Sequence, residues 1–444
     1  MNVINRYLSE SAVYRFYCRR IASMGLVAFW EEYVFESEHK LRHLPFFEEI
    51  ASRNEGTPEW RASMAGVVVL RLVDAWIEDG PRVVAADDWG MRSVRNAIDE
   101  LESNEKLRSI LRSVVEVLES STNVDMGVLA PRMMAYGQLL EYDAKWTLAA
   151  DVYASIIAHT HPVQEADVAT QAHLRRGFCL RQMGDLPASL SAYQTAGEIA
   201  RSANDMIGVL RARIGEAKAA ISRGNMPHAR DILDETIVRA TEHGLQAVRS
   251  MALHDRSTVS FLTGEYDLSI RFAYQALSIS ESARERDRIL GDIAAAFYKL
   301  GVHSAARDAY LILAATAQEQ YERWVATLNL MEVAAFDGDE LLFEQYRRSL
   351  SAQALPPQLE AFYWLQAGQG YEQLGHLHDA RDFLTRAVAF ADENELYQFV
   401  FEADAALKAL GTGARSRARS NITVDDELEA IANRLSDQRQ GIGV

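Results

Sequence analysis

A helical pattern recurs seven times between residues 126 and 394, and this repetition limits what the chain can fold into more than any other feature. The clearest copy has Gly368 and Tyr371 before a turn at Gly375, and the small residue Ala380 after it. The turn residue recurs at spacings of 40, 40, 40, 37, 37 and 37, at Ala144, Gly184, Gly224, Gly264, Gly301, Gly338 and Gly375. Such a period is typical of stacked helical hairpins, each of which buries its apolar side on its neighbour.

Each copy also carries the residues that a helical hairpin needs around its turn. Five residues after the turn, a small or apolar residue stands where two helices have to approach closely: Ala149, Ser189, Ala229, Ser269, Ala306, Phe343 and Ala380. Four residues later a larger side chain recurs, at Tyr153, Tyr193, Leu233 and Tyr310. Polar residues able to cap the second helix follow the turn, at Asp185, Asn225, Glu265 and Asp339. We therefore expect a glycine-rich turn between two antiparallel helices in each copy.

The regions outside the repeats are also predicted to be helical. Before residue 126 the apolar spacing favours helices over 41–50, 60–77, 91–102 and 106–118, with Thr57 before Pro58 as a start signal for the second. After the array, residues 396–410 read as one capping helix, and residues 424–434 as a short helix in a loose tail. The predicted domains are an N-terminal helical domain (1–125), the array (126–394), the capping helix (395–411) and a linker with a mobile tail (412–444).

Composition narrows the class of protein further. The 444 residues carry a net charge of −17, which disfavours the phosphate attraction that supplies most nucleic-acid affinity. Cys18 and Cys179 are too few for a disulfide framework, so a reducing cytosol fits best. The first residues lack a signal-peptide pattern, and the apolar run from Met64 to Leu70 ends at Arg71, short of a membrane span. We expect a soluble cytoplasmic protein with no membrane contact.

The hairpin resembles the tetratricopeptide repeat, whose pattern places Trp, Leu-Gly and Tyr on the first helix and Ala and Phe on the second. Trp364, Gly368 and Tyr371 match the first helix, and Gly177 with Tyr193 fits another copy; the likeness covers about 60% of the chain. The period exceeds the family's usual ~34 residues by about one or two helical turns, and the closing proline is absent. The resemblance implies an α-α superhelix of right-handed twist, with a concave groove, lined by the first helices, that holds a peptide or a partner segment.

Residues on the first helices are the candidate binding site for such a partner. Residues 171–249 contain eleven Lys and Arg but only eight Asp and Glu, so this stretch carries a net positive charge within an acidic chain. Basic side chains here could meet a carboxylate or an acidic peptide, although a solvated face with internal ion pairs is the simpler interpretation. The candidates are Arg175, Phe178, Arg181, Arg211 and Lys218, with His254, Arg288, Asn329 and Gln369 extending the same surface on later first helices.

Metal and catalytic sites find little support in the sequence. His39 and His43 stand four apart after Glu36, a spacing compatible with metal ligands, but no third ligand presents itself and an exposed helix is the favoured interpretation. The pairs His159/His161 and His376/His378 fall beside turns and are interpreted in the same way. Motifs for nucleophilic hydrolases, phosphate-binding loops, dinucleotide sites and di-iron bundles are absent. We expect no metal, no cofactor and no enzymatic activity.

We therefore predict an all-α scaffold or adaptor whose concave face binds a protein or peptide, and the positive stretch favours an acidic partner. Self-association through the N-terminal domain is a further expectation. The alternative is a peptide-gated regulator that switches a partner by changing the superhelical pitch, because long-period arrays with a helical N-terminal domain also look like bacterial receptors of signalling peptides.

Overall fold

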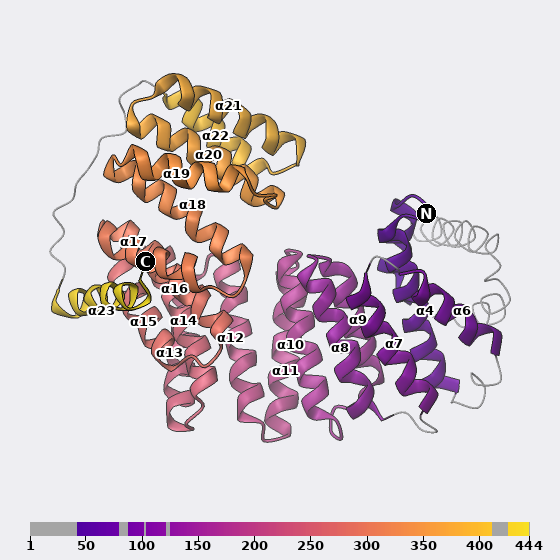
Figure 1. Ribbon diagram of the computed structural model, residues 1–444. Helices are drawn as coiled ribbons and strands as arrows, with labels where there is room; N and C mark the ends of the chain where they lie inside the picture. Colours follow the sequence, from indigo (N-terminus) through magenta and orange to yellow (C-terminus); the bar gives the residue numbers. More distant parts are fainter. Residues whose placement is uncertain (1–41, 80–87, 102–103, 121–124, 411–424, 444) are drawn as a thin grey trace, which may run out of the picture. The chain divides into compact units, whose positions relative to one another are not determined.

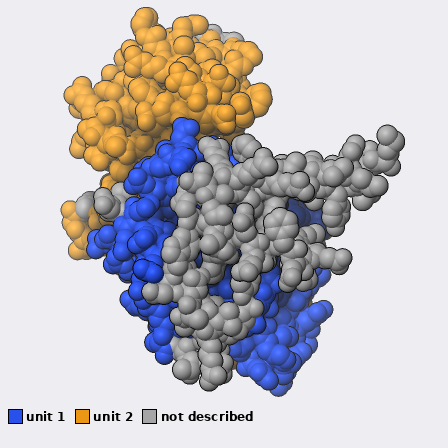
Figure 2. Space-filling model, turned by 90° about the vertical axis from the view of Figure 1, so that its right-hand side faces the viewer, with its two compact units in different colours: residues 1–224 blue, residues 225–444 orange. Residues whose placement is uncertain are grey.

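The computed structural model describes residues 42–79, 88–101, 104–120, 125–410 and 425–443 (Figure 1). All regular elements within these residues are α-helices, as the sequence predicts, and the described residues contain twenty of them. The chain forms two compact units, residues 1–224 and residues 225–444 (Figure 2), and each is described by itself. None of the helices in the described ranges is both long and apolar enough to cross a membrane.

Unit 1 joins four N-terminal helices to the first repeats. Its helices are α3 (Leu44–Ser52), α4 (Pro58–Asp79), α6 (Asp88–Asp99), α7 (Glu105–Ser120), α8 (Met126–Tyr142), α9 (Trp146–His159), α10 (Ala166–Gln182), α11 (Leu186–Ser202) and α12 (Met206–Ser222). The hydroxyl of Thr57 accepts a hydrogen bond from the backbone N–H of Trp60 at 3.3 Å, so the predicted start signal of α4 is used.

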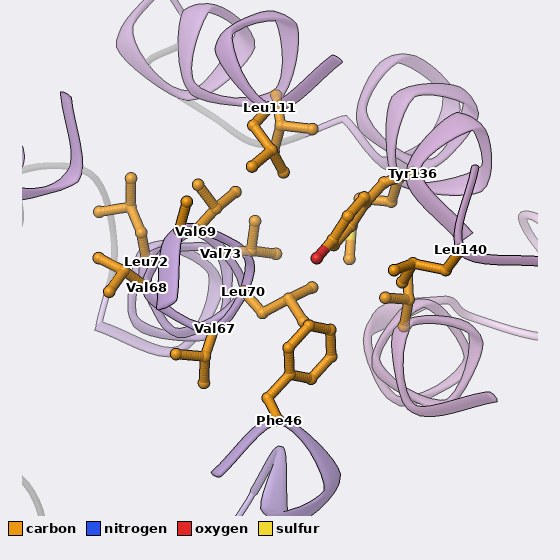
Figure 3. Packing of buried hydrophobic residues seen from close by; sticks show 14 of the residues in the cluster. Phe46, Val67, Val68, Val69, Leu70, Leu72, Val73, Leu111, Tyr136 and Leu140 are labelled. Atoms are coloured by element: carbon orange, nitrogen blue, oxygen red, sulfur yellow. The ribbon is translucent and has the colours of Figure 1, made fainter. Parts of the chain in front are cut away.

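The large apolar core of unit 1 contains buried residues from Phe46 to Cys179, and a smaller cluster includes Tyr193 and Ala212 of α11 and α12. Helix α4 lies inside the large core, with Val67, Leu70 and Val73 all at most 1% exposed. Figure 3 shows Phe46, Leu111 and Tyr136 reaching this core from α3, α7 and α8. Because α7 packs on α8, and α3 and α4 pack on α9, the N-terminal helices cover the first hairpin.

Unit 2 continues the alternation of helices. Its helices are α13 (Met226–Glu242), α14 (Gln246–Leu262), α15 (Tyr266–Ile279), α16 (Ala283–Leu300), α17 (His303–Thr316), α18 (Gln320–Asp337), α19 (Glu340–Ser351), α20 (Pro357–Leu374), α21 (Leu377–Glu393), α22 (Tyr397–Ala409) and α23 (Asp426–Ile442). Consecutive helices pack as pairs, and the first helices of successive pairs, α14, α16, α18 and α20, also touch one another. Helix α22 packs on α21 and α20 at the end of the array.

The predicted turns are confirmed at all seven positions. Each turn residue has a positive φ, from 56° at Ala144 to 88° at Gly375, which is the left-handed conformation that glycine adopts without a steric cost. The two spacings also have a structural cause. Between Gly184 and Gly264 the second helices α11 and α13 have 17 residues each, whereas α15 and α17, in repeats of the shorter period, have 14. The first repeat keeps the longer spacing with a 14-residue second helix, α9, because a longer connection, residues 160–165, follows that helix.

The close approaches within the hairpins are confirmed as well. All seven predicted contact positions are at most 2% exposed. A Cβ at Gly177 would lie 2.9 Å from the ring of Tyr193, which shows why the first helix needs a glycine opposite that aromatic residue. Three of the four predicted caps, Asp185, Asn225 and Asp339, accept a backbone hydrogen bond.

Two local predictions are wrong. Glu265 makes no capping hydrogen bond, because its carboxylate instead accepts hydrogen bonds from Arg230 at 2.7 Å and from Thr263 at 3.2 Å. The C-terminal helix is longer than the predicted helix over residues 424–434: it has 17 residues, Asp426–Ile442, and it packs against α17 and α15. The sequence pattern of this helix is weak, because its buried apolar residues are only Leu428, Ile431 and Leu435 within a strongly polar segment.

Candidate functional site

All nine predicted binding residues lie on the first helices of the repeats. Helix α10 carries Arg175, Phe178 and Arg181, and α12 carries Arg211 and Lys218; in unit 2, His254 lies on α14, Arg288 on α16, Asn329 on α18 and Gln369 on α20. In unit 1, α10 contacts both α8 and α12, so side chains from three first helices meet. We call the surface formed by Glu141, Gln171, Arg175, Phe178 and Arg211 the first-helix face of unit 1.

Arg175 joins α10 to α8 on this face. Its Nη1 donates a hydrogen bond to Oε2 of Glu141 at 3.1 Å, and its side chain remains 37% exposed. The other carboxylate oxygen of Glu141 accepts a hydrogen bond from the hydroxyl of Tyr153 at 2.7 Å. Burial, and then the negative charge of Glu141, raise the pKa of the Tyr153 hydroxyl, which therefore stays protonated and donates. Glu141 is thus held in place while Arg175 keeps a solvent-facing side.

Arg211 is held against a neutral partner. Its Nη1 donates a hydrogen bond to the amide oxygen of Gln171 at 3.0 Å, which joins α12 to α10. Burial lowers the pKa of Arg211 below its ordinary value, and repulsion from Arg175 adds to the shift, while Asp205 opposes it. An arginine is charged at any physiological pH, so this half-buried guanidinium carries a full positive charge beside a second one. The pair of arginines would bind an incoming carboxylate favourably.

An aromatic pair from α9 and α10 lies beside Arg181. The rings of Phe178 and Trp146 meet edge to face with centroids 5.6 Å apart, and the Arg181 guanidinium lies 5.5 Å from the Phe178 ring. Trp146 also lines an open cleft of about 610 Å³ between α3 and the start of α9, together with Glu48 and Lys145. An apolar side chain beside a carboxylate would therefore find aromatic surface on this part of unit 1.

Two of the predicted residues of unit 2, His254 and Arg288, have carboxylates as neighbours. Nε2 of His254 lies 2.6 Å from the carboxylate of Asp292 on α16. Arg288 is exposed and lowers the pKa of Glu322 on α18, whose pKa is nevertheless raised, mainly by burial. The structure therefore places these two residues beside acidic groups, whereas the hydrogen-bond partner of Arg211 is the neutral Gln171.

The other three predicted residues are half-buried on their helices. The amide of Asn329 donates a hydrogen bond to the carbonyl of Val325 in its own helix at 2.8 Å. The residues Lys218 on α12 and Gln369 on α20 are likewise half-buried.

Sequence reasoning missed Glu141, Gln171 and Trp146. Gln171 stands four residues before Arg175 on α10, the spacing that places two side chains on one helix face, so it could have been found. Glu141 lies outside the positive stretch of residues 171–249 that contains Arg175. The sequence does not reveal which of the many carboxylates on neighbouring helices lies within hydrogen-bond distance of Arg175.

His43 is not on an exposed helix, contrary to the sequence interpretation; Glu36 and His39 lie outside the described residues. His43 precedes α3 and is 5% exposed. Its Nδ1 lies 2.6 Å from Asp151 and its Nε2 3.1 Å from Asp74. His159, also buried, lies 2.7 Å from the other oxygen of Asp74. Within the described part of the chain, no group of three or more His, Cys, Asp or Glu is arranged to hold a metal ion. The ion pairs of His43 and His159 with Asp74 and Asp151 form a network that ties the start of α3 to α4 and α9.

Comparison with known proteins gives matches among solved structures alone. No protein-family model matches the chain, and no curated protein matches it. A tetratricopeptide repeat protein from Parabacteroides merdae is similar over 62% of this chain and 98% of its own, with 11% identity and a TM-score of 0.41. The Rap conjugation gene regulator of plasmid pLS20, in complex with the Phr* peptide, is similar over 85% and 96%, with 13% identity and a TM-score of 0.45. The apo quorum sensor NprR from B. thuringiensis is similar over 76% and 97%, with 14% identity and a TM-score of 0.45.

The repeats are tetratricopeptide-like helical hairpins. The evidence is in the chain itself: paired helices joined by left-handed turns, with a small residue of one helix packed against a large residue of its partner. In this fold the first helices offer a row of side chains from neighbouring repeats, and in unit 1 that row contains Arg175, Phe178 and Arg211.

Proposed function

We propose that this protein is a non-catalytic binding scaffold whose first-helix face in unit 1 takes an extended segment of another protein, or a peptide, that presents a carboxylate. The observation that carries the proposal is Arg211, a half-buried guanidinium whose Nη1 is bonded to the neutral amide of Gln171, next to Arg175. A carboxylate would relieve the repulsion between the two arginines and accept hydrogen bonds from both. The gain is largest where the guanidinium has already lost part of its water.

The neighbours of the two arginines indicate what should accompany the carboxylate. Phe178 and Trp146 lie on α10 and α9, beside the arginines of α10. An apolar residue close to the acidic one in the ligand would bury its surface against these rings, at about 25 cal/mol per Å². We therefore propose a ligand in which acidic and apolar residues alternate within a few positions.

The alternative, a peptide-gated regulator, is favoured by one specific feature of the same face. The contacts Glu141–Arg175 and Gln171–Arg211 connect α8 to α10 and α10 to α12. A ligand carboxylate that captured the arginines would compete with both contacts and change the spacing of the first helices. Such a change is the differential interaction that a switch requires.

Selection from a library of random displayed peptides tests the binding proposal. Peptides selected on the wild-type protein should be enriched in Asp, Glu or a free terminal carboxylate. They should bind Arg211→Gln and Arg175→Gln about 10- to 100-fold more weakly, because a charge-assisted hydrogen bond contributes about 1.5–3 kcal/mol. Arg201→Gln, an exposed position at the end of α11, is the matched control and should bind normally. Selected peptides that lack carboxylates and bind all variants equally would overturn the proposal.

Small-angle X-ray scattering with a selected peptide separates the two functions. A regulator should change its scattering curve on saturation, and the arginine variants should not respond. An unchanged scattering curve at saturation would exclude a switch that acts through the superhelical pitch, and the scaffold function would remain.

A further inference from the structure

The C-terminal helix α23 forms an interface with helices that lie far before it in the sequence. Leu428, Ile431 and Leu435 lie on one side of α23 and are at most 4% exposed. They belong to the same apolar cluster as residues of α15 and α17, such as Ile270 and Ile312. Helix α23 lies against α17 and α15 (Figure 1), whereas the helix before it in the described chain, α22, ends the array on α21.

Charged contacts fix the direction of α23 on this surface. At its start, Asp425 and Glu427 form ion pairs with Arg271 of α15. In the middle, Arg434 donates a hydrogen bond to the hydroxyl of Tyr274 at 3.1 Å. Near its end, Arg439 lies 2.8 Å from Asp308 of α17. We call the surface of Ile270, Arg271, Tyr274, Asp308 and Ile312 the α15–α17 face.

The α15–α17 face has the chemistry of a helix-binding site. Asp308 is a carboxylate only 8% exposed, and burying a charge is costly unless a partner such as Arg439 compensates it. The face selects one orientation, because Arg271 pairs with the acidic start of α23 and Asp308 pairs with the basic residue near its end. This distribution of charge along α23 also suits the helix dipole. An amphipathic helix laid into a groove through apolar residues at positions i, i+3 and i+7 is a recurrent mode of recognition.

We propose that the α15–α17 face also binds α23 of a second copy once its own α23 is displaced, so that two copies pair by exchange of the C-terminal helix. The contacts described above involve α23 on one side and α15 or α17 on the other. A second copy supplies the identical helix, and exchange reproduces every one of them. The intramolecular form is favoured by the effective concentration of a tethered helix, typically millimolar. Exchange therefore becomes favoured when α23 is released from its own chain or the protein is concentrated.

Complementation between two defective full-length chains tests the exchange. The first variant, Ile431→Asp with Leu435→Asp, keeps its face but has a helix that no longer docks. The second variant, Arg271→Glu with Asp308→Arg, keeps its helix but has a face that repels it. Each variant alone should sediment as a monomer of about 50 kDa. A 1:1 mixture at about 100 μM should double in mass, because neither chain has a tethered helix on its own face to compete with the helix of the other chain. The control is a single variant, Asn433→Asp with Gln438→Asp, which is altered on the exposed side of α23. Its helix should still dock on its own face, and the protein should stay monomeric at the same concentration.

A labelled peptide of residues 425–443 distinguishes the ways in which this test could fail. The peptide should bind the first variant, whose face is empty, and should bind wild type at least 10-fold more weakly. If the peptide binds but the mixed chains remain monomeric, exchange between copies is refuted. If neither binds while circular dichroism shows both variants folded, the face does not bind a helix in trans, and the proposal is likewise overturned.

Discussion

The ring of Phe343 fills the space that a Cβ at Gly370 would need. A Cβ built on Gly370 would lie 2.3 Å from Cε2 of Phe343, far inside van der Waals contact. Phe343 stands where the other repeats have Ala or Ser, and it is fully buried in the short helix α19. The neighbouring helix α20 therefore compensates a large residue in one repeat with a glycine in the next.

This compensation predicts that the effect of Gly370→Ala on the free energy of unfolding depends on Phe343 and changes sign when Phe343 is replaced. Gly370→Ala should lower the stability of the wild-type protein by about 1–3 kcal/mol, because an extra methyl group in a filled core forces shifts. In a Phe343→Ala background, which itself costs about 3–5 kcal/mol, the same change should be neutral or stabilise by up to ~1 kcal/mol through helix propensity. Urea unfolding of the four proteins measures both effects. Equal destabilisation in the two backgrounds would show that Phe343 is not the obstacle.

The caps provide a second comparison within unit 2. Asp339 accepts a hydrogen bond from the backbone N–H of Leu342 at 3.0 Å, whereas Glu265 makes no capping bond. Asp339→Ala should therefore cost about 1 kcal/mol. Glu265→Ala should cost less than about 0.5 kcal/mol, since its contact with Arg230 is between groups that are each 35% exposed. Thermal unfolding of both variants checks the ranking, and a larger loss for Glu265→Ala would contradict it.

The turns and buried contact positions were predictable because their constraints are local and repeated. A left-handed turn needs glycine or a tolerant residue, and two touching helices need a small one, so the pattern shows in one sequence. The arginine contacts were not predictable in the same way. Arg175 could have paired with any of several carboxylates, and only the packing of α8 on α10 selects Glu141. The role of His43 was hidden for the same reason, because its partners Asp74 and Asp151 are 31 and 108 residues away.

The ion network around His43 predicts a loss of stability at alkaline pH. Although burial alone would lower it, hydrogen bonds to Asp151 and Asp74 raise the pKa of His43 to about 9. His159 and Arg42 also face Asp74. A group whose folded-state pKa is raised stabilises the protein fully below its unfolded pKa, near 6.5, and loses that contribution as the pH rises through about 9.

Comparison with His43→Gln isolates this effect. Wild type should be more stable than the variant by a few kcal/mol at pH 6, and the difference should shrink steadily between pH 6.5 and pH 9. Urea unfolding midpoints of both proteins across this range provide the measurement. A difference that stays constant with pH would mean that His43 is not charged in the folded protein.

Glu141 competes with a ligand for Arg175, so its removal should strengthen binding. Glu141→Gln keeps an acceptor for the hydroxyl of Tyr153 but removes the negative charge beside Arg175. An acidic peptide selected on the wild-type protein should bind this variant about 3- to 10-fold more tightly, corresponding to about 1 kcal/mol. Fluorescence anisotropy measures the affinity, with Glu198→Gln on α11 as the control. Weaker binding to Glu141→Gln would show that the ligand does not bring a carboxylate to Arg175.

The location of the bound carboxylate can be observed on the arginine side chains themselves. In protein labelled with ¹⁵N-arginine, the Nε–Hε resonances of Arg175 and Arg211 can be assigned through their Arg→Lys variants and followed while a selected acidic peptide is added. Both resonances should shift in parallel with binding, while that of Arg201 on α11 stays in place. Saturation of the protein with no shift at Arg175 or Arg211 would show that the ligand binds elsewhere and that the first-helix face of unit 1 is not the binding site.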